Sequence, residues 1–172
     1  MLRWAVRRSF GPVAIRYPRG GNGIYHDSGW NDLAGIPTNA VCTHRKGKDV
    51  TILTYGVLVN EAVKAAEILE QHGVSATVLR LLIAAPLPVD EILMNLSENH
   101  RVYIVEEIAG NCGIRDQLAA LLRKKDPNCC VDGWDLGNRY IPHGSMDKLY
   151  DYYGLSGEQI ARSVLEGYRS ED

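Results

Sequence analysis

The residues best placed to do chemistry lie just after an apolar run over residues 102–105, where two acids and a turn precede a helix. Glu106 and Glu107 come first, the turn Ala109–Gly113 follows, and apolar residues then recur at helical spacing. Such a turn can bind an anion, because the first N–H groups of a helix have no partner within it. Glycine also lets a helix pack closely on a strand. We favour a structural turn over an anion site.

Three side chains near this region are candidates for proton transfer. Glu106 and Glu107 end a strand, so one points to each face of the sheet. We expect these carboxylates to be solvated or paired with another domain rather than to act as acid or base. His143 lies in the turn 142–144, and we expect it to bond to the backbone. We therefore predict no catalytic residue in this chain.

The cysteines do not form a metal motif. Cys42, Cys112, Cys129 and Cys130 lack a C-x-x-C pair and have no histidine at ligand spacing, so we predict no metal site. Cys129 and Cys130 are adjacent and point to opposite faces of a strand. This favours one buried and one half-exposed thiol in a reducing compartment, and hence a cytoplasmic location.

Composition excludes some classes of partner. The chain has 172 residues, 45% of them hydrophobic and 23% charged, with a net charge of −2. A protein that binds nucleic acid needs a basic surface, and a membrane span needs roughly 20 apolar residues in a row. We therefore expect neither partner. The first 20 residues contain five arginines and no acid. That pattern resembles a mitochondrial transit peptide, but the strand-like residues that follow favour native structure.

Periodicity predicts alternating strands and helices over residues 49–107. A β-branched run at 50–55 predicts a strand, helical spacing follows over 58–73, and 76–82 predicts a second strand. Residues 89–99 predict another helix, and 102–105 a third strand. Successive β-helix-β units favour a parallel sheet covered by helices. We predict an α/β three-layer sandwich with a mostly parallel sheet of about five strands.

The remaining C-terminal elements are shorter. Helical spacing over 114–122 is followed by a strand near 129–131 and a short extended piece within 135–141. Ser145 is a candidate cap for a helix that Gly154 ends, and Ser156 with Gln159 forms a possible capping box for the last helix.

The N-terminal part predicts a separate piece of structure. Pro12–Tyr17 is strand-like, and a glycine-rich turn follows it. Residues 23–48 show neither period, which is typical of a connector. We therefore divide the chain into 1–22, a linker over 23–48, and a domain over 49–172. The strand expected at 12–17 lacks a sheet of its own, so it should pair with another chain or lie loosely on the domain.

Several of these segments resemble 1-deoxy-D-xylulose-5-phosphate synthase. Residues 11–20 resemble the end of that family's pyrimidine-binding domain. The run at 48–56 resembles the first strand of its C-terminal, transketolase-type domain. Pro86-Leu87-Pro88, Val105-Glu106-Glu107, Tyr140-Ile141-Pro142-His143-Gly144-Ser145 and Tyr153-Gly154-Leu155 follow in the family's order. The motif at 141–145 favours this synthase over transketolases and pyruvate dehydrogenase β subunits.

The resemblance implies part of a larger transferase. Members condense pyruvate with glyceraldehyde 3-phosphate, with loss of carbon dioxide, and use thiamine diphosphate and magnesium. The diphosphate, the metal and the activating glutamate belong to two preceding domains. The resemblance thus implies a structural and dimer-forming role for this chain, with the remaining domains of the same enzyme as partners. It also implies that the chain alone binds no cofactor and is inactive.

The resemblance offers two arginines as candidates for the family's substrate contact. Arg19 aligns with an arginine that contacts the substrate phosphate, and Arg16 is the second candidate. A guanidinium group matches phosphate oxygens in a bidentate manner, and a glycine-rich turn lets the backbone approach. Either arginine could instead pair with a carboxylate or remain in solvent.

The chain also departs from the family. Leu82 and Ala85 stand where an arginine and a lysine are usual, and the turn after Glu107 is shorter and has fewer glycines. Contacts between domains made by those basic groups would be lost, which suggests a diverged relative or a degenerate copy. Two other interpretations remain open. One is a free-standing α/β binding module with a ligand at Ala109–Gly113, and the other is a subunit that completes a split transketolase.

Overall fold

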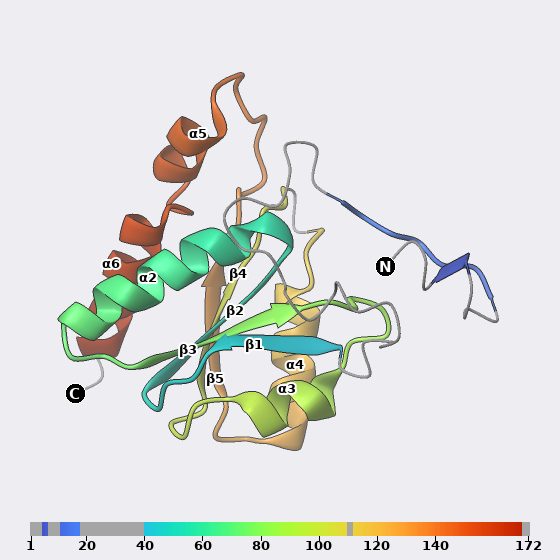
Figure 1. The fold of residues 1–172 in the computed structure, drawn as a ribbon, viewed down its shortest axis with the longest axis horizontal. Coiled ribbons are helices and arrows are strands. Elements are labelled where there is room, and N and C mark those ends of the chain that lie inside the picture. The colour runs from blue at the N-terminus through green and yellow to red at the C-terminus, as the bar shows by residue number, and fades with distance from the viewer. Residues whose placement is uncertain (1–4, 7–10, 18–39, 110–111, 170–172) are drawn as a thin grey trace.

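The computed structural model describes residues 5–6, 11–17, 40–109 and 112–169 (Figure 1). Its strands are β1 (Val41–Arg45), β2 (Val50–Tyr55), β3 (Ala76–Leu81), β4 (Arg101–Val105) and β5 (Cys130–Trp134). Its helices are η2 (Gly56–Leu58), α2 (Val59–Gln71), α3 (Val89–Asn95), α4 (Arg115–Lys125), α5 (Met146–Tyr152) and α6 (Gly157–Arg169). The elements predicted over residues 49–107 are confirmed, with bounds shifted by a few residues.

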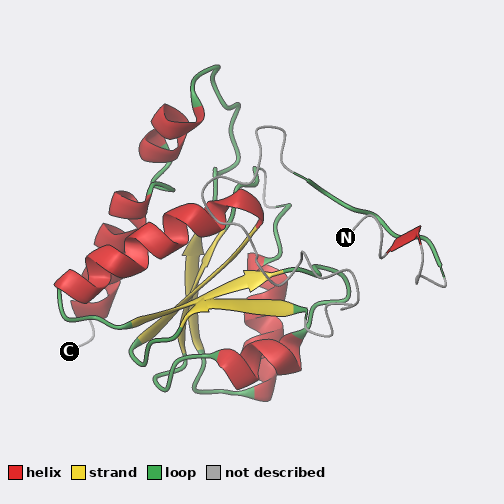
Figure 2. Ribbon diagram, in the orientation of Figure 1, coloured by secondary structure: helices red, strands yellow, loops and turns green. Residues whose placement is uncertain are grey.

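The strands form one sheet in the order β1-β3-β2-β4-β5. β2 is parallel to both β3 and β4, and β4 is parallel to β5, whereas β1 is antiparallel to β3. Helices cover both faces of this sheet (Figure 2). The predicted three-layer α/β sandwich with a mostly parallel sheet of five strands is therefore confirmed.

The sheet has a hydrophobic core on each face, because successive side chains of a strand point to opposite sides. Val50 and Ile52 of β2 are buried in the core beneath α2 and α6. Leu53 of the same strand is buried in the core beneath α3 and α4. Both faces of the central strands are therefore apolar, as expected for parallel strands between two helical layers.

β1 lies within the segment expected to be a linker, residues 23–48. Residues 41–45 form an edge strand of the main sheet, and the carboxylate of Glu91 on α3 holds its start. This carboxylate accepts hydrogen bonds from the backbone N–H groups of Ala40 and Val41, each at 2.9 Å. The ordered domain thus begins before residue 49. Residues 23–39 lie outside the described part of the chain.

The N-terminal segment over residues 11–17 is extended but is assigned no strand, so the strand expected at 12–17 is not formed. Among the described residues it is not part of the main sheet. Val13 is 42% exposed and Tyr17 is 80% exposed, so little of the domain covers this segment. The glycine-rich turn that follows lies outside the described residues.

The caps proposed for the last two helices differ from those in the structure. Ser145 makes no capping hydrogen bond through its side chain. The side chains of Ser156 and Gln159 instead contact a carboxylate oxygen of Asp151, at 3.4 and 3.5 Å. The N–H of Gly157, at the start of α6, donates to Glu61 of α2 at 2.8 Å. The start of α6 is thus held by the helix beside it.

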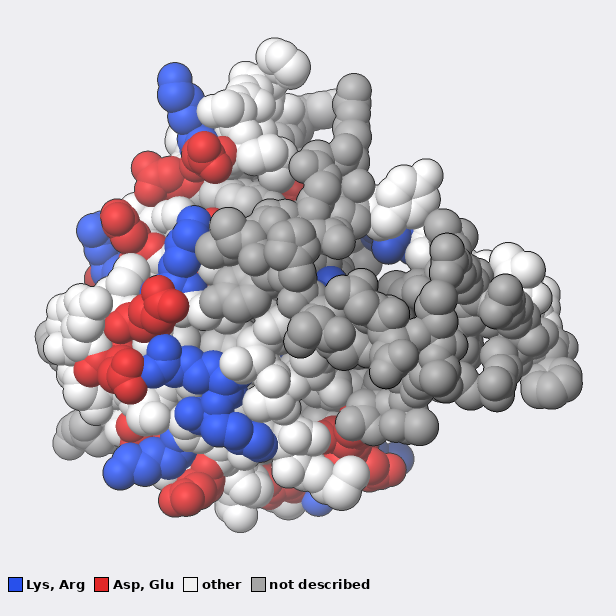
Figure 3. Space-filling model, viewed as in Figure 1, with Lys and Arg blue, Asp and Glu red and all other residues white. Residues whose placement is uncertain are grey.

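The surface carries charges of both signs. Acidic and basic side chains are interspersed over the described part of the face in view, in keeping with the small net charge (Figure 3). No helix among the described residues has the length and apolar character needed to cross a bilayer.

Candidate functional site at the carboxyl edge of the sheet

The strand order marks one place as the expected ligand crevice. β3 lies on one side of β2 and β4 lies on the other, so the chain reverses direction across the sheet at β2. In open α/β sheets, ligands bind at such a point, beyond the carboxyl ends of the two strands that flank it. Here Tyr55 ends β2, and Glu106 directly follows β4.

Glu106 fills this crevice with a buried carboxylate that is only 1% exposed. One of its oxygens accepts the N–H of Ile114 at 2.7 Å and the hydroxyl of Tyr55 at 3.0 Å. The other oxygen accepts the N–H of Arg115, the first residue of α4, at 3.1 Å. We call Glu106, Tyr55, Ile114 and Arg115 the latch, because together they join the ends of β2 and β4 to the start of α4.

The latch occupies the position that an external anion would take. A carboxylate already accepts the free N–H groups at the start of α4 and interacts favourably with the helix dipole. A Cβ atom on Gly113 would lie 2.3 Å from an oxygen of Glu106, so the turn passes directly against the carboxylate. The space left beside it is about 10 Å³, at the lower limit for one water molecule. The geometry favours a structural turn. Glu106 is buried and bonded internally rather than solvated.

Glu107 lies on the other side of the strand end and is exposed, as expected of a solvated carboxylate. It accepts the hydroxyl of Tyr150, on α5, at 2.9 Å. Burial, followed by the charge of Glu107, raises the pKa of Tyr150 above its ordinary value. This hydrogen bond ties α5 to the end of β4.

Arg16 acts at the same edge. Burial raises the pKa of the Tyr55 hydroxyl, the charge and hydrogen bond of Glu106 raise it further, and the positive charge of Arg16 partly offsets them. The exposed guanidinium of Arg16 therefore lies within electrostatic range of the carboxyl end of β2. Arg19, the first candidate for the phosphate contact, lies outside the described residues.

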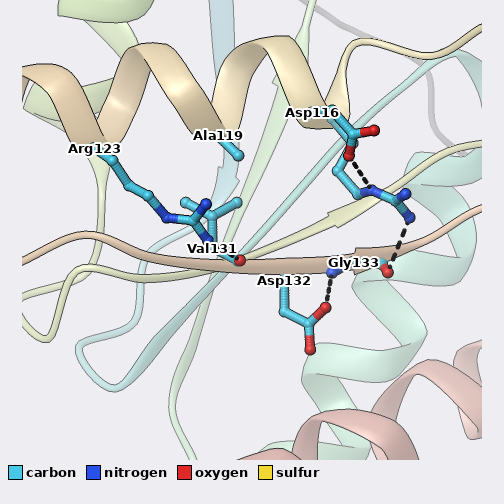
Figure 4. A pocket seen from close by; sticks show the side chains of 7 residues that line it. Asp116, Ala119, Arg123, Val131, Asp132 and Gly133 are labelled. Carbon is cyan, nitrogen blue, oxygen red and sulfur yellow. Dashed lines mark hydrogen bonds and ion pairs between the residues drawn. The ribbon is translucent and has the colours of Figure 1, made fainter. Parts of the chain in front are cut away.

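A polar cleft of about 320 Å³ follows the outer edge of β5 (Figure 4). Arg115 donates to the carbonyl of Gly133 at 3.2 Å, and Arg123 donates to the carbonyl of Val131 at 2.8 Å. Asp132 accepts the N–H of Gly133 at 2.7 Å. Side chains thus satisfy backbone groups that an edge strand would otherwise leave free.

The other candidates from the sequence do not gather into a site. His143 is exposed in the loop before α5. Cys129 is buried, and burial raises the pKa of its thiol to about 11, whereas Cys130 and Cys112 are exposed. Within the described part of the chain, no group of three or more histidine, cysteine or acidic side chains could hold a metal ion.

Sequence reasoning missed the latch. It considered Glu106 alone and did not consider Tyr55. Their positions gave a signal, because Tyr55 ends one predicted strand and Glu106 follows another. Two such residues meet if the two strands are parallel neighbours in the sheet.

The fold and the closed crevice define a three-layer α/β domain whose ligand position is occupied by its own side chains. The family model described as "Transketolase, C-terminal domain" matches residues 40–160, and the chain belongs to that family. The solved structures agree on the fold. A structure titled split gene transketolase, inactive beta4 tetramer, has a TM-score of 0.64 at 23% identity, covering 75% of this chain and 42% of that chain.

Curated relatives of the chain are much longer synthases. The chain is 34% identical over 167 residues to 1-deoxy-D-xylulose-5-phosphate synthase of Heliobacterium modesticaldum, covering 96% of this chain and 25% of the relative. It is 32% identical over 171 residues to the synthase of Gloeothece citriformis, covering 98% of this chain and 26% of that relative. The chain therefore spans about a quarter of the length of the curated relatives that it matches.

Proposed function

We propose that this chain works as the C-terminal, structural and dimer-forming part of a 1-deoxy-D-xylulose-5-phosphate synthase. The observation that carries this role is the latch, because the buried Glu106 carboxylate lies at the switch point of the sheet and accepts the N–H groups that a substrate anion would use there. Similarity to whole synthases over a quarter of their length supports the same assignment. The chain then contributes folded surface to an active site that other domains provide.

As the family resemblance implies, the complete enzyme joins pyruvate to glyceraldehyde 3-phosphate, releases carbon dioxide and is a cytoplasmic homodimer. Thiamine diphosphate, bound with magnesium, would stabilise the negative charge that develops on a substrate carbon. The described residues do not fit this group, because the crevice is closed and no described cluster could hold the metal. As the family resemblance implies, we propose that preceding domains of the enzyme hold the cofactor.

This chain contributes to substrate binding through the positive charge of an arginine. Arg19 or Arg16 holds the phosphate of glyceraldehyde 3-phosphate in the intact enzyme. The exposed position of Arg16 beyond β2 supports this role, since its guanidinium is free to face a preceding domain. A guanidinium group binds phosphate oxygens in a bidentate manner and so fixes the orientation of the substrate.

A chimera tests the proposal. This chain replaces the quarter of the Heliobacterium synthase that it matches, and product formation from both substrates is measured with thiamine diphosphate and magnesium. We expect activity in the chimera and none when that quarter is deleted. A folded, dimeric chimera without activity would contradict the proposal.

The isolated chain provides the complementary measurement. Calorimetric titration with thiamine diphosphate and magnesium, and then with glyceraldehyde 3-phosphate, should give no binding heat. Saturable cofactor binding would instead favour a free-standing binding module. Activity regained by mixing this chain, unfused, with a transketolase lacking its C-terminal part would favour the split-subunit interpretation.

A further inference from the structure

An arm projects from the domain after β5. We define the arm as residues 138–148, every one of which is exposed. Tyr140 is fully exposed, and Ile141 and Met146 are 40% and 48% exposed. Figure 1 shows this loop rising beyond the carboxyl end of β5 before the chain turns into α5. Large apolar side chains gathered on one projecting loop typically mark an interaction surface.

The residue at the C-terminal cap of α5 has an incomplete polar contact. Tyr153 is buried, and its hydroxyl has no hydrogen-bond partner among the described residues. Arg139 of the arm lies over its ring at 5.3 Å, and Tyr152 meets it edge to face at 5.0 Å while remaining 70% exposed. Buried hydroxyl groups in folded proteins are almost always bonded, so this one favours an acceptor from outside the described chain.

The arm and the N-terminal segment share one edge of the sheet. Tyr150 of α5 donates to Glu107 after β4, and the neighbouring Glu106 accepts from Tyr55 at the end of β2. Arg16 of the N-terminal segment acts on Tyr55. Hydrogen bonds thus join both the end of β2 and the base of the arm to the two glutamates after β4, and Arg16 lies within electrostatic range of the end of β2.

We propose that the arm, with Tyr152 and Tyr153, is the docking surface for the preceding domains of the same synthase. This proposal rests on the function proposed above. The relatives are about four times as long as this chain, so a large folded body must lie against this domain in a complete enzyme. Val13 and Tyr17 of the N-terminal segment are also exposed, and Arg16 between them lies within electrostatic range of the same edge.

The test compares backbone hydrogen exchange of the arm in the isolated chain and in the chimera. In the isolated chain we expect fast exchange over residues 138–148 at every protein concentration. In the chimera the same amides should exchange at least about tenfold more slowly, because docking removes them from water. An arm that stays equally fast in an active chimera would overturn the docking proposal and leave the proposed function intact.

A matched pair of variants supplies the second readout. Tyr140→Ser with Ile141→Ser removes the apolar tip of the arm, and Met94→Ser alters a residue on α3 that is 77% exposed. We expect the arm variant of the chimera to lose activity by about tenfold and the Met94 variant to keep it, as for a localised interface. Equal activities would overturn the proposal.

The remaining outcomes separate this inference from the proposed function. An inactive chimera with a protected arm would support docking and contradict the function, whereas an inactive chimera with an exposed arm would contradict both. Protection of the arm that rises with the concentration of the isolated chain would show that a second copy covers it. That result would overturn the proposed occupant.

Discussion

The latch and the arm lie at the same edge of the sheet, yet they satisfy their polar groups in opposite ways. Glu106 is buried, and each of its oxygens is bonded within the domain. The Tyr153 hydroxyl is also buried but lacks a partner among the described residues, and every residue of the arm before it is exposed. The latch therefore serves the fold of this domain, whereas the arm has the character of the docking surface proposed above.

Replacing Glu106 should break the latch most strongly. Glu106→Ala removes the acceptor of three donors, two of them at the start of α4, and should cost about 3 kcal/mol of unfolding free energy. Glu106→Gln keeps one acceptor oxygen and should cost less. Urea unfolding measures both. The control is Glu107→Ala, which loses one hydrogen bond at an exposed carboxylate and should cost about 0.5 kcal/mol. Similar losses of unfolding free energy at both positions would show that burial of Glu106 does not increase its contribution to stability.

Adding one carbon atom at Gly113 should strain the latch without removing any polar group. The Cβ of Gly113→Ala would lie 2.3 Å from Glu106, so either the turn or the carboxylate must move. We expect a loss of about 2 kcal/mol in the same unfolding assay. Gly11→Ala is the control, because its Cβ would meet nothing within 4 Å. If Gly113→Ala unfolds like the wild type, the turn does not hold the carboxylate in place.

Two tyrosine substitutions compare the regions directly. Tyr55→Phe removes a hydroxyl that donates to Glu106 and should destabilise the isolated chain by about 1 kcal/mol. Tyr153→Phe removes a buried hydroxyl without a described partner, so it should leave the isolated chain as stable or slightly more stable. In the chimera, where the docked domains supply an acceptor for this hydroxyl, Tyr153→Phe should lower the free energy of unfolding. A loss at Tyr153 in the isolated chain would instead place an acceptor within this chain.

Alkaline pH should weaken the edge of the sheet. The pKa values of Tyr55 and Tyr150 are raised in the folded state, chiefly by burial and then by Glu106 and Glu107 respectively. Ionisation is therefore easier in the unfolded chain, so these tyrosines stabilise the fold below pH 10 and lose that contribution as pH rises above it. Urea midpoints from pH 8 to 11 should fall less steeply in Tyr55→Phe with Tyr150→Phe. Tyr140→Phe, which changes an exposed ring, is the control.

The smallest effect is expected at the tip of the arm. Tyr140→Ser with Ile141→Ser should change the stability of the isolated chain by less than about 0.5 kcal/mol, because these side chains contribute little to its core. Thermal unfolding of the isolated chain provides the measurement. A large loss would mean that the arm packs on its own domain, which would remove the contrast with the latch.

The strands and helices over residues 49–107 were predictable because burial in the core imposes a regular spacing of apolar residues along the sequence. The runs around Ile52 and Val102 are apolar on both faces, and α2 keeps a clear helical stripe, so residues 49–107 could be assigned from the sequence. β1 was missed because an edge strand is buried on fewer sides, and residues 42–45 include a histidine and an arginine. Its pairing depends on β3 and on Glu91, which are distant in the chain.

The candidate site depended on register and exposure, neither of which has a local signal. Tyr55 and Glu106 are 51 residues apart and meet only because β2 and β4 are neighbours. The motif at 141–145 indicated a family, but its residue types did not show that the whole arm would be exposed. The divisions at residues 22 and 48, and the role of Arg19, stay predictions.

The polar cleft along β5 restricts how this domain can assemble with others. An incoming strand that tried to extend the sheet would find the carbonyls of Val131 and Gly133 already occupied by arginines. Charged side chains over an edge strand are a general defence against aggregation through backbone pairing. Partners must therefore recognise this domain by its side chains. Loss of Arg123 would leave the carbonyl of Val131 free to accept a hydrogen bond from a misfolded chain, and aggregation could begin there.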